Sequence, residues 1–188
     1  MADVRDLFVK ASKLYEDAVH QIREDQWHLP TPCTEWDVRA LLQHLVNEQL
    51  WLPPLLDGMT IAEVGDRFDG DNLGDDPVSS WDVAAAAARA AVEGVKDLQR
   101  TTHLSFGDFT AQEYLDQMVF DLHIHGWDLR TGIGADTMMD AELTSYLMPW
   151  AEIAMKAYEQ VGATAPPPPI PQGASDQTKI LALSGRRG

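Results

Sequence analysis

Several residue types that mark common protein classes are scarce in this chain. It has one cysteine, Cys33, in 188 residues, so an internal disulfide is excluded. Lys and Arg number 14 against 30 Asp and Glu, which gives a formal net charge of -16 at pH 7. Because phosphate backbones and anionic lipid surfaces attract basic patches, this balance argues against nucleic acids and membrane surfaces as partners.

Long apolar runs are also missing. The richest apolar window, Val83–Val92, is mostly alanine and contains Arg89, far short of the roughly 20 apolar residues that a membrane span needs. The N-terminal stretch lacks the apolar core of a signal peptide. No Ser occupies a strand-to-helix elbow, so the Ser/His/Asp geometry of nucleophilic hydrolases is not predicted. We therefore expect a soluble, cytoplasmic protein.

What the chain does contain is helical periodicity over most of its length. With about 100–200 residues per domain, a chain of 188 residues predicts one compact domain. Apolar residues recur at spacings of three and four, and Thr110-x-x-Glu113 is a capping box that opens one of the later helices. Pro53 and Pro54 should kink or end the second helix. Helices are predicted over residues 3–26, 34–51, 79–99, 110–129 and 140–160.

This pattern predicts an all-α fold, an up-and-down four-helix bundle with an additional C-terminal helix and an extended Pro-rich tail. The bundle is expected over residues 1–165, with residues 166–188 as a strap that packs on it. The acidic connection of residues 57–80 is longer than most loops and is expected to form a lid or rim. No strand is predicted.

Three side chains are candidates for a metal site. Asp121 and His125 are four residues apart in a predicted helix, so they project from the same face one turn apart. His44 can complete the site from a facing helix. Two imidazoles and a carboxylate suit Zn²⁺ or another divalent transition metal, and three protein ligands leave one coordination position open.

Other interpretations of these residues stay open at this point. A helical histidine beside a core is often structural, and Asp121 with His125 can be a surface pair worth about 0.2–0.5 kcal/mol. His123 lies on the opposite flank of the helix and is set aside. Asp128 is not a predicted metal ligand, but it can orient a ligand by forming a hydrogen bond to it. Three polar neighbours are otherwise interpreted as rim groups: Glu48, Tyr114 and Asp128.

Three stretches of the chain resemble a known family: residues 27–46 (WHLPTPCTEWDVRALLQHLV), 121–134 (DLHIHGWDLRTGIG) and 169–186. They are similar to an actinobacterial family related to the metal-binding N-terminal domain of mycothiol-dependent maleylpyruvate isomerase. This domain belongs to the DinB-like helical-bundle superfamily. The resemblance implies that His44 and His125 stand where the family has its histidine ligands, and that Asp121 stands in place of a ligating Glu.

Two departures from the family pattern bear on the activity. Asp is one methylene shorter than Glu, so Asp121 reaches less far towards an ion. The isomerase also has a C-terminal domain that contributes substrate contacts, for which this chain leaves no room. We therefore expect the family's metal site with a different substrate.

The resemblance implies a divalent-metal-dependent transferase or isomerase that uses a low-molecular-weight thiol such as mycothiol on a small electrophilic substrate. The metal is expected to be Zn²⁺, with Ni²⁺ or another transition metal as alternatives, and a metal-activated water is the other use of the same geometry. No residue is assigned a catalytic role. The alternative is a non-catalytic metal-binding or partner-binding bundle. Bundles of this kind often pair, which leaves a homodimer open.

Overall fold

The computed structural model describes residues 2–160 and 167–187 of the chain. Helices predominate in these residues, and one short hairpin joins them, so the predicted all-α class is correct apart from the hairpin. Contacts between residues divide the chain into two units, Met1–Ala135 and Asp136–Gly188. In the part of the chain that is described, no helix is both long and apolar enough to span a membrane.

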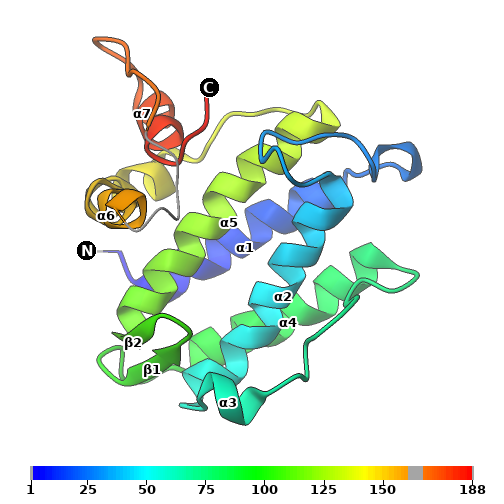
Figure 1. Ribbon diagram of the computed structural model, residues 1–188, viewed down its shortest axis with the longest axis vertical. Coiled ribbons are helices and arrows are strands. Elements are labelled where there is room, and N and C mark those ends of the chain that lie inside the picture. The colour runs from blue at the N-terminus through cyan, green and yellow to red at the C-terminus, as the bar shows by residue number, and fades with distance from the viewer. Residues whose placement is uncertain (1, 161–166, 188) are drawn as a thin grey trace. The chain divides into compact units, whose positions relative to one another are not determined.

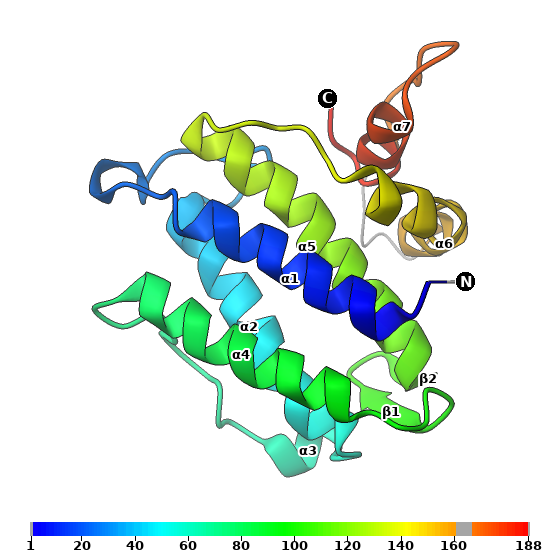
Figure 2. The same ribbon diagram turned by 180° about the vertical axis from the view of Figure 1, so that it is seen from behind.

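The first unit contains the helices that carry the candidate site. Four long helices, α1, α2, α4 and α5, lie side by side in both views (Figures 1 and 2). Their apolar faces form a core from which water is excluded. The elements are α1 (Val4–Val19), the 3-10 turn η1 (Glu24–Gln26), α2 (Val38–Leu56), α3 (Ile61–Val64), α4 (Pro77–Gly94), β1 (Thr101–Leu104), β2 (Gly107–Thr110) and α5 (Ala111–Ile133).

The four long helices do not simply alternate in direction, which corrects the up-and-down prediction. The connection after α3 runs back along α2, where the Asn72 amide donates to Asn47 at 2.6 Å and Arg39 pairs with Asp71 at 3.2 Å. Because this segment returns to the beginning of α2, α4 starts at the same end and runs in the same direction. The acidic connection is therefore a crossover along the bundle and includes the short helix α3.

Helix α5, which carries Asp121 and His125, begins where the capping box predicted. The Thr110 hydroxyl accepts a hydrogen bond from the Glu113 N–H at 3.2 Å, and the Glu113 carboxylate accepts one from the Thr110 N–H at 2.8 Å. The helix ends at Gly134, whose φ of 71° is the left-handed cap conformation that glycine favours. It extends four residues further than predicted.

Helix α2, which carries His44, differs from the prediction at both ends. It begins at Val38, four residues later than predicted, because the carboxylate of Asp37 accepts the capping hydrogen bond, from the Ala40 N–H at 2.8 Å. It continues through Pro53 and Pro54 to Leu56. Proline keeps a helical φ, and the buried leucines of the last turn hold that turn against the core.

The first and third predicted helices end earlier than expected. Helix α1 stops at Val19, where the N–H groups of Gln21 and Ile22 bond three residues back, to Ala18 and Val19, and tighten the chain. Helix α4 stops at Gly94, because Val95 is extended. In both segments apolar periodicity continues past the true end, since the following residues are also buried in part.

The hairpin of β1 and β2 was not predicted from the sequence. Its antiparallel register pairs Thr101 with Thr110 and Leu104 with Gly107. Each strand has four residues, too few for alternation to stand out. The hairpin lies between α4 and α5, and α5 begins at the residue that follows β2.

The second unit contains α6 (Ala141–Gln160) and α7 (Asp176–Leu183). Helix α6 matches the predicted span of 140–160, and α7 contains the short apolar piece of residues 180–183. Their buried residues are Leu143, Leu147, Ala151, Met155, Ile180, Leu181 and Ala182. Contacts group α6 with α7 in this unit, and the predicted extent of the bundle, residues 1–165, stays a prediction. The Pro-rich strap of residues 166–188 stays a prediction, and residues 161–166 and 188 lie outside the described part.

Candidate metal centre

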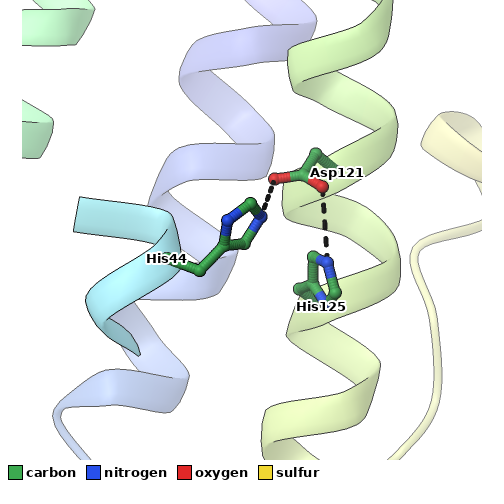
Figure 3. A group of neighbouring side chains, drawn as sticks. All are labelled: His44, Asp121 and His125. Atoms are coloured by element: carbon green, nitrogen blue, oxygen red, sulfur yellow. Dashed lines mark ion pairs between the residues drawn. The ribbon is translucent and has the colours of Figure 1, made fainter. Parts of the chain in front are cut away.

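Helices α2 and α5 bring the three predicted ligands together. His44 Nε2 lies 3.3 Å from Asp121 Oδ2, and His125 Nε2 lies 3.4 Å from Asp121 Oδ1. Figure 3 shows the carboxylate of Asp121 between the two imidazole rings. One nitrogen or oxygen atom from each residue lies within 4.8 Å of the others, the only such group of three among the described residues.

Each histidine nitrogen lies at a distance from one carboxylate oxygen of Asp121 that is longer than a strong hydrogen bond and suits two ligands of one ion. A charge-assisted N–H to carboxylate hydrogen bond is about 2.7–2.9 Å long, shorter than either distance in this site. Two ligands that each lie about 2.0–2.2 Å from one tetrahedral zinc ion are separated by about 3.3–3.5 Å. The observed nitrogen–oxygen distances of 3.3 and 3.4 Å fall in that range.

The carboxylate of Asp121 is also incompletely satisfied. Its Oδ2 atom is buried and meets the geometry of no hydrogen bond in the described part of the chain; its partner is His44 Nε2, in an ion pair at 3.3 Å. A buried carboxylate oxygen with such a distant partner is weakly satisfied, and a coordinated cation would satisfy it better. The donor set and this oxygen therefore both suit a divalent cation held by His44, Asp121 and His125.

Without an ion, Asp121 and His125 form an ion pair in which each residue shifts the pKa of the other. Burial by itself lowers the pKa of His125, but the charge of Asp121 and hydrogen bonds to Asp121 and Asp128 outweigh it and raise the pKa from 6.5 to about 9. Burial acts to raise the pKa of Asp121, yet the positive charges of His125 and His44 hold it well below its usual range. A metal ion therefore has to displace a proton from His125.

Asp128 holds the second nitrogen of His125. The carboxylate oxygen Oδ2 of Asp128 lies 2.8 Å from His125 Nδ1 and accepts its hydrogen bond, which leaves Nε2 directed at Asp121. Asp128 is completely buried, so the rim interpretation was wrong for this residue, and the orienting role predicted from sequence fits its position. Its burial follows from the close packing of α5 on the rest of the bundle.

Glu48 lies on α2 one helical turn beyond His44. Burial, followed by the negative charge of Asp121, raises the pKa of Glu48 from 4.5 to about 7. Its side chain is partly buried, as expected for a group at the border of the core, whereas Tyr114 is only 4% exposed and belongs to the core. A carboxyl group that ionises near neutral pH thus stands beside the centre.

Trp36 is the site residue that sequence reasoning missed. Its ring centroid lies 4.7 Å from that of His44 and 5.6 Å from that of His125. The residue lies in the loop before α2, whereas the sequence predicted it inside a helix over residues 34–51, where eight positions would separate it from His44 by about 12 Å along the axis. Only the folding of this loop onto both helices brings the indole to the histidines.

Two other sequence candidates stay outside the centre. His123 is 7% exposed and does not belong to the group of three, as its position on the other flank of α5 predicted. Cys33 is partly buried in the loop, and its carbonyl oxygen accepts a hydrogen bond from the Trp36 N–H at 2.8 Å.

Comparisons with known proteins find relatives of this chain and a matching family model. Two curated relatives, uncharacterized proteins from Mycobacterium tuberculosis strains CDC 1551 and H37Rv, are each 29% identical over 138 residues. The match covers 71% of this chain and 69% of each relative. No solved structure matches the chain. The model of the mycothiol maleylpyruvate isomerase N-terminal domain matches residues 10–130, which include α2, α5 and all three candidate ligands. The chain therefore belongs to the family of the mycothiol maleylpyruvate isomerase N-terminal domain.

Proposed function

We propose that this protein is a divalent-metal protein that activates a low-molecular-weight thiol, of the mycothiol type, for transfer to a small electrophilic substrate or for its isomerisation. The single observation that carries the proposal is the convergence of His44, Asp121 and His125 at spacings that suit one cation. Membership of the family adds the thiol. We favour Zn²⁺, because two imidazoles and one carboxylate are a common set of zinc ligands.

A zinc ion held by His44, Asp121 and His125 would supply Lewis acidity and would lower the pKa of a bound thiol or water molecule. The residues of the chain do the rest. His44 and the pair on α5 hold the ion from two helices, and Asp128 keeps His125 in the ligating orientation. When the thiol adds to an activated carbon–carbon double bond, its sulfur bonds to one carbon and its proton passes to the other.

Metal content tests the first part of this proposal. The full chain is purified without an affinity tag or chelator, and its metals are measured by mass spectrometry beside those of His44→Ala and His125→Ala. His103→Ala is the matched control, since His103 pairs with Asp108 on the hairpin. We expect near-stoichiometric metal in the wild type and the control, and little in the other two variants. Equal metal in all four proteins would contradict the site.

Thiol binding tests the second part. Calorimetric titration of the zinc-loaded and zinc-free wild type with mycothiol should show binding that depends on the metal. Binding to neither form, in a protein that does hold the metal, would favour the non-catalytic metal-binding bundle. The size of the assembly in solution, measured by light scattering, tests whether the chain forms the homodimer that its sequence leaves open.

A further inference from the structure

The candidate metal centre is closed towards the core and open towards solvent. Neighbours of the ligands in sequence, Leu45, Leu122 and Ile124, are at most 2% exposed. In contrast, the side chains of His44 and Asp121 keep 25% and 28% of their area accessible. A small molecule that reaches the centre therefore approaches from the solvent side.

Trp36 lies where the buried side of the centre meets the solvent side. The indole packs on the rings of His44 and His125 and is itself partly exposed. Two hydrogen bonds hold its backbone: the Trp36 N–H donates to Cys33 at 2.8 Å, and the Thr31 hydroxyl donates to the Trp36 carbonyl at 2.8 Å. The indole is thus a fixed aromatic surface beside both imidazoles.

The loop that carries Trp36 is also seated closely on α5. A Cβ atom added at Gly132 would lie 3.2 Å from the Pro30 carbonyl oxygen and 3.2 Å from the Thr31 methyl carbon. Glycine at this position lets the loop lie against the helix. The position of Trp36 is therefore set by α5 as well as by the hydrogen bonds of the loop.

The negative charges around the metal centre limit which small ligands can bind beside the indole of Trp36. Glu48 lies on α2 one helical turn beyond His44, on the same face of the helix, and is partly buried. Asp121, Asp128 and Glu48 thus bring three carboxylates to the centre, so a ligand with two further negative charges meets repulsion in a partly buried site. A neutral or singly charged ligand avoids most of this repulsion.

We propose that Trp36 is a specificity-determining residue, whose indole binds the planar aromatic or conjugated part of a small ligand held at the metal centre, in preference to saturated ligands of the same size. The charges beside it select against dianions. This inference rests on the proposed metal function and names the class of molecule that the centre accepts. Contacts between aromatic rings are worth about a three- to tenfold preference beyond the buried area.

The test compares two thiols of matched size on the cobalt-loaded full chain, with the visible absorption of the cobalt as the readout. The probes are benzyl mercaptan and cyclohexylmethanethiol. The ratio of their dissociation constants is measured for the wild type, Trp36→Leu and Trp36→Phe, so that intrinsic differences between the thiols cancel. We expect Trp36→Leu to reduce the preference for the aromatic thiol three- to tenfold and Trp36→Phe to retain most of it.

The outcomes separate this inference from the function on which it rests. A wild type that takes up no cobalt contradicts the metal centre, and one whose cobalt spectrum responds to neither thiol contradicts the thiol function. If both thiols bind and Trp36→Leu weakens them equally, or changes neither, the specificity role of Trp36 is wrong. A uniform loss would mean that the indole only supports the imidazoles.

The proposed selection against dianions is tested by a separate measurement. Mercaptosuccinate, which adds two carboxylates to the thiol, should bind the cobalt-loaded wild type at least tenfold more weakly than 2-mercaptoethanol. Glu48→Gln should recover part of that loss, whereas Glu93→Gln, at an exposed position on α4, should not. Equal binding of the two thiols by the wild type would overturn the selection against dianions.

Discussion

His125 and Asp128 lie one turn apart on α5, and the carboxylate of Asp128 accepts a hydrogen bond from His125 Nδ1 at 2.8 Å. This contact fixes which nitrogen of the imidazole faces the metal centre. Asp128→Asn removes the negative charge, and we expect zinc affinity to fall by about 10- to 100-fold. Competition with a chromophoric chelator measures the change.

A matched control for this variant exists on the hairpin. His103 Nδ1 and Asp108 Oδ1 form a similar pair at 2.7 Å, in an exposed position away from the three candidate ligands. Asp108→Asn should leave zinc affinity unchanged. If Asp128→Asn and Asp108→Asn bind zinc equally well, the orienting role of Asp128 is wrong.

Zinc affinity should depend on pH through His125. In the metal-free protein the pKa of His125 is raised to about 9, yet only the neutral imidazole binds a metal. Below pH 9 each zinc ion must therefore release a proton, and the apparent affinity should fall about tenfold for every pH unit between 8.5 and 6.5. Chelator competition across this range gives the slope. An affinity that stays constant with pH would show that His125 is not a ligand.

Glu48 should destabilise the metal-free protein at alkaline pH. Its pKa rises from 4.5 to about 7 on folding, first because it is buried and second because Asp121 is negative, so the folded state holds this proton more tightly than the unfolded chain. The resulting stability is fully present below about pH 4.5 and is lost as the pH rises through 7. Glu48→Gln should remove that loss.

Urea unfolding at two pH values checks this prediction. At pH 8 we expect metal-free Glu48→Gln to be more stable than the wild type by about 1–3 kcal/mol, and at pH 4.5 we expect little difference. A variant that is equally stable at pH 8 would mean that the carboxylate is well solvated when it is ionised.

Two helical glycines should respond in opposite ways to alanine. At Gly132 the added methyl group meets the Pro30 carbonyl oxygen at 3.2 Å, whereas Gly94 has nothing within 4 Å. Gly94→Ala should stabilise the protein by about 0.5–1 kcal/mol through helix propensity. Gly132→Ala should destabilise it by about 1 kcal/mol, because overpacking outweighs that gain. Thermal unfolding compares the two, and stabilisation by both would show that the loop before α2 moves aside without cost.

The parts of the site that could be predicted from sequence depend on local geometry. The four-residue spacing of Asp121 and His125 puts both on one face of any α-helix, and the capping box at Thr110 sets where that helix begins. His44 was reached by its family resemblance and its place beside an apolar stripe. The ends of α1 and α4 were missed, since periodicity continues where hydrogen bonding stops, and the end of α2 was missed because the helix continues through Pro53 and Pro54.

The sequence by itself determined that the chain is mainly helical and strongly acidic, and that one helix carries a carboxylate and an imidazole on the same face. These properties follow from periods, caps and counts within a few turns of chain. The tertiary structure alone decided that His44 reaches this pair, that Trp36 covers both imidazoles, that Asp128 is buried and that α4 runs parallel to α2. Those features join residues far apart in sequence, and they depend on side-chain packing between helices, which no local pattern specifies.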